Sequence, residues 1–293
     1  RDSSIPLWVL GRFHELIPLS LRPVQFHVIQ SLDELLASAQ LVYREYLAKQ
    51  YVSPAAAQMK LSIYHALPQT TTCVARHRQG SIIGTVTVME DSPLGLPMDD
   101  AYKVELDSLR QRGRRLAEVA WLTVESRLFC RGTFAMTDGA KLLLLMRLLK
   151  VLLDYVRSST EINELVACFH PKHQLLFDYF GLAPLGGPKT YPGTGGTLTV
   201  ARHLDLDEAP QAMSHPTTRF FYGTKPSPKP FARKLIYSPE ELRRLFVLDS
   251  SVFASVSPTE LRYFRSCYPA YDFDEILEGV LPSSVAVHGL VKH

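Results

Sequence analysis

The spacing of hydrophobic residues predicts alternating strands and helices over the first two thirds of the chain. After Ser31, with Glu34 placed for a capping box, apolar residues recur at helical spacing. Two runs rich in β-forming residues then flank a turn with Gly80, which indicates a hairpin. Besides the helix that follows Ser31, the predicted elements are strands at 25–30, 71–76, 82–89, 116–124, 165–169 and 197–204, and helices at 99–112, 140–157 and 172–180.

This order of elements predicts an α/β (α+β) fold, with a mixed sheet and helices on both of its faces. The helix at 140–157 is apolar on nearly every side, so other elements must cover it. We expect an irregular segment at 1–24, the main domain at 25–207, a proline-rich linker or arm at 208–234, and a mostly helical extension at 235–293. Ser238 and Ser257 each precede proline and are followed three residues later by glutamate, which predicts two capped helices in the extension.

Composition limits the class of protein. The chain has 293 residues, 46% of them hydrophobic, and is long enough to bury a core without disulfides or metal ions. A net charge of +3 is too small to indicate nucleic-acid binding. One local cluster is more basic and could attract an acidic partner, or could be a solvated surface. It consists of Arg110, Arg112, Arg114 and Arg115.

The cysteines and the hydrophobic runs indicate a cytoplasmic protein. Four cysteines occur without a CxxC pair, which favours reduced thiols and argues against a structural zinc site. The chain has no signal-peptide pattern and no apolar run long enough to span a bilayer. We therefore expect no metal.

An ordered series of short motifs resembles the N-acyl amino acid synthases, which are related to the acyl-homoserine-lactone autoinducer synthases. The motifs are Val42-Tyr43-Arg44-Glu45-Tyr46, Ile83-Gly84-Thr85, Asp91-Ser92, Gly95-Leu96-Pro97-Met98, Glu105-Leu106-Asp107, Leu109-Arg110, Gly113-Arg114-Arg115, Ala117-Glu118-Val119 and His170-Pro171-Lys172-His173. The resemblance covers about residues 25–205. It implies a GNAT-like fold, that of the GCN5-related N-acetyltransferases. It also implies transfer of a fatty acyl group from an acyl carrier protein thioester to the amine of an amino acid.

Glu118 is the first candidate for a catalytic base. An amino acid is an ammonium ion at neutral pH, and the attacking amine must lose a proton. Glu118 lies within an apolar strand, where burial would raise its pKa toward a useful value. The resemblance also places it at the strand glutamate of the autoinducer synthases. The alternative is a structural ion pair with Arg44 or Arg114.

Other side chains have both a functional and a structural interpretation. Arg44 could bind the substrate carboxylate, or tie its helix to Asp91 or Glu118. Asp91 could bind the acceptor ammonium or cap a turn, and His173 could be a second base or a helix cap. Two further candidates for substrate binding are Tyr43, from the first of these motifs, and Trp121, which follows Glu118 in the same strand.

Two departures from common GNAT enzymes affect the donor and the leaving group. Residues 131–140 lack the glycine-rich loop that binds the pyrophosphate of coenzyme A, which favours a carrier-protein donor. The arginines at 110–115 could then meet the acidic carrier protein. Phe177 stands where a tyrosine often protonates the leaving thiol, so we expect a thiolate leaving group.

Two other functions remain open. One is an autoinducer-type or aminolipid-type acyltransferase, although Trp121 stands where autoinducer synthases tend to have arginine. The other is a non-catalytic domain that binds acyl carrier protein or lipid. We expect no tightly bound cofactor, with acyl carrier protein or acyl-CoA as the donor thioester, and a free amino acid and a fatty acyl chain as the other partners. Nucleic acid is not expected, and peripheral membrane contact and the oligomeric state stay open.

Overall fold

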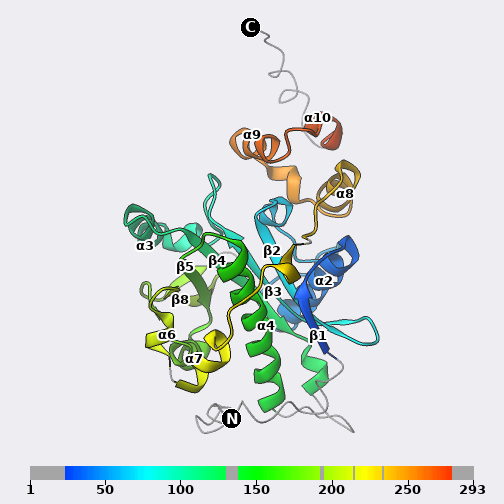
Figure 1. Ribbon diagram of the computed structural model, residues 1–293. Helices are drawn as coiled ribbons and strands as arrows, with labels where there is room; N and C mark the ends of the chain where they lie inside the picture. Colours follow the sequence, from blue (N-terminus) through cyan, green and yellow to red (C-terminus); the bar gives the residue numbers. More distant parts are fainter. Residues whose placement is uncertain (1–23, 130–137, 192–194, 214, 233, 279–293) are drawn as a thin grey trace.

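The computed structural model describes residues 24–129, 138–191, 195–213, 215–232 and 234–278. Its centre is an eight-stranded mixed sheet in the order β1-β2-β3-β4-β5-β8-β6, with β7 also paired to β8 (Figure 1). Of these pairs, β4–β5 is parallel and the others are antiparallel. The strands are β1 Val24–Val28, β2 Thr70–His77, β3 Ile82–Glu90, β4 Leu116–Val124, β5 Glu164–Phe169, β6 Ala183–Pro184, β7 Lys189–Tyr191 and β8 Thr197–Asp205.

Helices cover both faces of the sheet. Helix α4 (Asp138–Ser159) packs on one face, while α2 (Leu32–Ala48) and α3 (Asp99–Gln111) cover the other (Figure 1). The alternation along β4 separates the two cores, because Leu116 joins the α3 cluster and Ala117 joins the α4 cluster. The expected mixed sheet with helices on both faces is therefore confirmed.

The local signals in the sequence give most of these boundaries. The Ser31 hydroxyl accepts a hydrogen bond from the Glu34 N–H and caps α2, whereas the Glu34 carboxylate reaches the Gln30 N–H instead of that of Ser31. The helix predicted at 172–180 is in fact a 3₁₀ turn, η4 (Pro171–His173), followed by α5 (Gln174–Tyr179). It ends before Gly181, whose φ of +77° is readily adopted by glycine. The sequence analysis missed β6 and β7, because strands of two and three residues show no hydrophobic period.

The segment at 208–234, expected as a linker or arm, contains short helices that pack on the main domain. They are α6 (Ala209–Ala212), α7 (His215–Tyr222) and the 3₁₀ turn η6 (Lys229–Phe231). Met213, Phe221 and Phe231 are buried in the cluster around α4. Each of these elements has proline in its first two residues and is short, so helical periodicity could not be recognised in the sequence.

The extension forms a second aromatic core against α2 and the 3₁₀ turn η2 (Ile63–Ala66). Serine caps at Ser238 and Ser257 form the expected capping boxes. Tyr237 Oη donates to the His65 carbonyl at 2.8 Å, and Tyr268 Oη donates to the Ala66 carbonyl at 2.6 Å. Its elements are α8 (Pro239–Arg243), the π turn η7 (Arg244–Leu248), η8 (Val252–Ser255), α9 (Pro258–Cys267) and α10 (Phe273–Ile276).

The described residues include three of the four cysteines. Cys73, Cys168 and Cys267 carry free thiols, and Cys130 lies outside the described residues. Within the described ranges, no helix combines the length and the apolar character that crossing a bilayer requires.

Candidate active site

A wedge opens in the sheet between β4 and β5. The two strands pair only from Leu116–Glu118 to Glu164–Val166 and then diverge. At the same place β4 has a bulge opposite Val86 in β3, because Thr85 faces Thr123 but Thr87 faces Ala120. Trp121 lies in this bulge with a φ of 52°, a left-handed conformation that is unusual for a bulky residue. The bulge therefore shifts the β3–β4 register just beyond the point where β4 stops pairing with β5.

The wedge contains a groove with a cavity volume of about 230 Å³. Both diverging strands contribute to its walls, together with α2, α4 and α5. Its polar or aromatic lining includes Tyr46, Lys49, Tyr51, Trp121, Thr123, Lys141, Cys168, Phe169, His170, His173, Phe177, Thr197 and Thr199.

Glu118 is buried in β4 beside this groove. It is 2% exposed, and its Oε2 accepts a hydrogen bond from the Met98 N–H at 2.8 Å. Burial, reinforced by the charges of Asp99 and Asp100, raises its pKa to about 8, although the hydrogen bond opposes this rise. Oε1 makes no hydrogen bond with any described residue. The carboxyl group is therefore a weak acid that can gain or lose a proton near neutral pH.

Electrostatic coupling connects Glu118 with the groove wall. Burial raises the pKa values of Tyr46 and Cys168 above their usual range, and the charge of Glu118 raises both further. These two side chains line the groove, whereas Glu118 is not among its lining residues. Tyr64 and Tyr191 respond to Glu118 in the same way. The carboxyl group is thus electrostatically coupled to hydroxyl and thiol groups, two of which line the groove.

Trp121 is held in place by a second ring. The rings of Trp121 and His65 stack with centroids 4.3 Å apart and an interplanar angle of 26°. Burial lowers the pKa of His65 to about 4, so the imidazole is neutral at pH 7. Its Nδ1 accepts a hydrogen bond from the Ser62 N–H at 3.1 Å. The extension holds the backbone of η2 at the same turn, so it supports the groove wall through His65 and Trp121.

A cluster of cations surrounds one end of the groove. Lys49 and Lys141 line the groove. Lys172 lies in the sequence between His170 and His173, which line the groove as well. Burial lowers the pKa of Lys49, and the charges of Lys141 and Lys172 lower it further. Desolvation and the same three lysines hold the pKa of His173 at about 4. This end of the groove is therefore positive and suited to an anion.

Several predicted site residues lie outside the groove. Arg44 is exposed and pairs with Glu125 at 3.0 Å, and not with Asp91 or Glu118. Tyr43 is buried, and its hydroxyl accepts a hydrogen bond from the Ala55 N–H at 2.8 Å. The side chains of Arg44, Tyr43 and Asp91 do not line the groove among the described residues. Their proposed contacts with substrate stay predictions.

The predicted arginine cluster is divided by ion pairs. Arg110 binds Asp91 at 2.6 Å and Asp99 and Asp107 at 2.7 Å each. The remaining members differ from one another in exposure and partners. Arg114 pairs with Glu164 and Asp205 at 2.7 Å each, Arg112 is exposed, and Arg115 is exposed and donates to the Glu161 carbonyl. Neither Arg44 nor Arg114 pairs with Glu118, and carrier-protein binding at this cluster stays a prediction.

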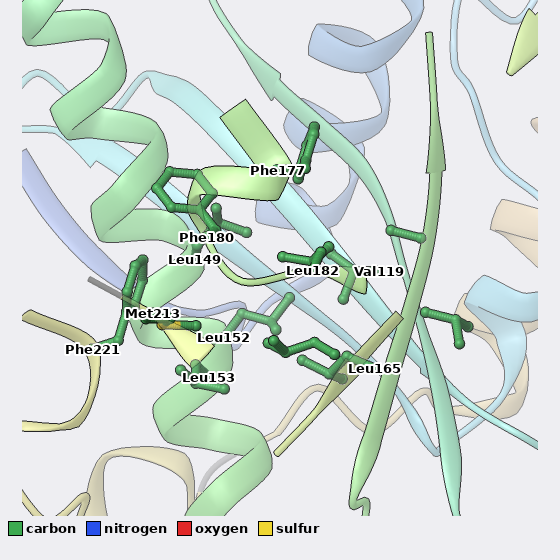
Figure 2. Close-up of a pocket in the computed structure, with 13 residues that line it drawn as sticks. Val119, Leu149, Leu152, Leu153, Leu165, Phe177, Phe180, Leu182, Met213 and Phe221 are labelled. Carbon is green, nitrogen blue, oxygen red and sulfur yellow. The ribbon is translucent and has the colours of Figure 1, made fainter. Parts of the chain in front are cut away.

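An apolar cavity adjoins the groove. Four residues line both spaces, and the cavity has a volume of about 70 Å³. All of its lining side chains are aliphatic, aromatic or methionine, and Figure 2 shows them gathered between α4 and the sheet. The shared residues are Val119, Leu149, Ala167 and Phe177.

Sequence reasoning missed part of this arrangement. The apolar character of the helix at 140–157 fitted either an acyl-chain slot or core packing, and the predicted basic site was at 110–115 and not at Lys49, Lys141 and Lys172. The three lysines are far apart in the chain, so no local sequence pattern indicates that they form one site. No group of three or more metal-ligating side chains occurs among the described residues.

Comparison with known proteins identifies the family. The family model described as N-acyl amino acid synthase FeeM matches residues 37–205, more than half of the chain. A similar solved structure is that of FeeM, an N-acyl amino acid synthase from uncultured soil microbes, with 25% sequence identity and a TM-score of 0.55. The alignment covers 65% of this chain and 94% of the FeeM chain. No curated protein matches the chain.

Other similar structures include two acyl-homoserine lactone synthases. LasI is 14% identical with a TM-score of 0.45, covering 73% of this chain and 97% of its own. MesI is described as a CoA-dependent acyl-homoserine lactone synthase. Its sequence is 15% identical, and its structure has a TM-score of 0.47, covering 68% of this chain and 96% of its own. The family match and the wedge in the sheet agree with the motifs that run from the first helix to His173. The chain therefore belongs to the family of the N-acyl amino acid synthase FeeM, and it is an acyltransferase with a GNAT-like fold.

Proposed function

We propose that this acyltransferase joins a fatty acyl group, delivered as a thioester on a phosphopantetheine arm, to the amine of an amino acid. The observation that carries this proposal is that two spaces adjoin each other. A groove that is positive at one end shares four lining residues with an apolar cavity, and the strand β4 that lines both spaces carries a buried carboxyl group with a raised pKa. A thioester at the junction would have its phosphate among cations and its acyl chain among hydrocarbon side chains.

The positive end of the groove supports a phosphorylated donor. Lys49, Lys141 and Lys172 can neutralise the phosphate that acyl carrier protein and coenzyme A both attach to the pantetheine arm. Residues 131–140 lack a pyrophosphate-binding loop in sequence, and this favours acyl carrier protein. An acidic carrier protein would also be attracted to the same cations.

Glu118 serves as the base in this proposal. The incoming ammonium gives a proton to the Glu118 carboxylate through a water molecule, and the amine nitrogen attacks the thioester carbon. The C–N bond forms, and the carbonyl oxygen carries the negative charge of the tetrahedral intermediate. Backbone N–H groups of β4 beyond Glu118 would stabilise this oxyanion, because β4 no longer pairs with β5 there. The C–S bond then breaks, and the thiolate takes up the proton that the nitrogen loses.

The test is direct. The protein is incubated with acyl carrier protein thioesters or acyl-CoA and a mixture of amino acids, and N-acyl amino acids are measured by mass spectrometry. We expect amide products with the wild type, and with Glu118→Gln a loss of turnover without loss of donor binding. Glu161→Gln, which changes an exposed carboxylate outside the groove, is the matched control. Donor binding without any acyl transfer would favour a non-catalytic binding domain, and a lactone formed from S-adenosylmethionine would favour the autoinducer chemistry.

A further inference from the structure

The lining residues on α4 and β5 define the axis along which the apolar cavity extends. Along α4, Leu145 and Leu149 line the groove, while Leu149, Leu152 and Leu153 line the cavity. Along β5, Ala167 is shared, and the cavity continues to Leu165. Both elements therefore give the same axis, which runs from the junction toward the C-terminal end of α4.

The far end of this axis is closed by residues outside the part of the chain that matches the family model. Met213, which follows α6, and Phe221 of α7 line the cavity, whereas the match ends at residue 205. In Figure 2 both side chains lie on the α4 side of the cavity, away from Phe177 and Val119, which the cavity shares with the groove. The segment at 208–222, which the sequence suggested as a linker or arm, therefore forms the closed end of the cavity.

This end is held firmly. Met213 and Phe221 are 9% and 3% exposed, and the Phe221 ring meets the Phe180 ring edge to face with centroids 5.9 Å apart. The Arg157 guanidinium of α4 lies over the Tyr222 ring at 4.6 Å and donates to the Phe221 carbonyl at 3.5 Å. Helix α7 is thus fastened to the helix that lines the cavity, and the closed end cannot yield without breaking these contacts.

We propose that Met213 and Phe221 are specificity-determining residues that set the longest acyl chain the enzyme accepts. This inference rests on the proposed function, because it assigns the cavity to the hydrocarbon chain of the donor. The lining offers no hydrogen-bonding side chain among the described residues, so the cavity suits an unsubstituted alkyl chain. A chain that reaches Phe221 has no further space and must bend back into the groove.

The dimensions give the size of the effect. Leu149 and Leu153 are four residues apart, so the cavity extends about 6 Å beyond the junction at the helical rise of about 1.5 Å per residue. With C–C bonds of about 1.5 Å in a zigzag, this depth holds roughly five methylene groups. Truncating Phe221 to alanine removes a ring from the end of the axis and should admit about two to four more carbons.

The experiment is a competition between donors. An equimolar mixture of thioesters with acyl chains from 6 to 18 carbons is offered with one amino acid, and products are quantified by mass spectrometry. We expect Phe221→Ala to shift the preferred chain length upward by two to four carbons, and Leu153→Phe, which fills the same end, to shift it downward. Phe220→Ala is the matched control, because this neighbouring phenylalanine on α7 does not line the cavity. Its profile should stay as in the wild type.

The outcomes separate this inference from the proposed function. If wild type and variants form amides with the same chain-length profile, the closed end does not measure the chain and the inference is wrong. If no thioester of any length is transferred by the wild type, the proposed function itself fails. Thermal unfolding followed by circular dichroism shows whether each variant is folded. If Phe221→Ala is unfolded, a downward shift with Leu153→Phe supports the inference and an unchanged profile refutes it.

Discussion

The charge state of Glu118 should control stability as well as activity. In the unfolded chain this carboxyl group has its usual pKa of 4.5, whereas in the folded protein burial raises its pKa to about 8. Between these pH values the unfolded state releases a proton that the folded state keeps. The folded pKa is the higher one, so the stabilising effect is complete below pH 4.5 and is lost as the pH rises to 8.

The magnitude follows from the size of the shift. One pKa unit corresponds to about 1.4 kcal/mol, so Glu118 should lower the free energy of unfolding by about 3 kcal/mol between pH 5 and pH 7.5. Glu118→Gln keeps an acceptor for the Met98 N–H but cannot ionise. We therefore expect the variant to match the wild type near pH 5 and to be more stable by about 3 kcal/mol at pH 7.5, although it is inactive.

The assay is urea unfolding of both proteins in buffers from pH 5 to pH 8. The difference between the two proteins isolates Glu118, because the other titrating groups are common to both. Glu161→Gln, at an exposed carboxylate, controls for the loss of one negative charge. Stability curves of wild type and Glu118→Gln that stay parallel over this pH range would show that Glu118 is ionised at low cost, and the argument for a buried base would fail.

Three other predictions follow from the site. The kcat/KM of the wild type should rise about tenfold per pH unit up to about pH 8 and then level off, because the base must be deprotonated; a profile that is flat from pH 6 to pH 8 would contradict this. Lys172→Ala should raise the KM for the donor several-fold and weaken the dependence of this KM on salt. Arg112→Ala, outside the groove, should change neither property. Equal effects of the two variants in steady-state kinetics would refute the location of the anion site. Tyr268→Phe removes the hydrogen bond to the Ala66 carbonyl and should cost about 1 kcal/mol in urea unfolding. In a Trp8→Phe background it should also change the fluorescence of Trp121, and an unchanged spectrum would mean that the extension does not support this ring.

The sequence by itself determined the elements whose signals are local. Strand β4 has the bounds predicted from its apolar run, Ser31 caps α2, and serine caps begin α8 and α9. These features depend on residues within a few positions of one another, so periodicity and capping patterns reveal them. The same reasoning placed Glu118 inside an apolar strand, which is the basis for its raised pKa.

The tertiary structure alone decided which distant residues share a space. The bulge at Trp121, the ion pairs that occupy Arg110, and the lysines that meet at the groove all depend on how separate segments pack. Met213 and Phe221 come from a segment with no clear periodicity, yet they close the cavity that α4 and the sheet begin. Packing in three dimensions brings such residues together through contacts between elements far apart in the chain, and no pattern of neighbouring residues encodes those contacts.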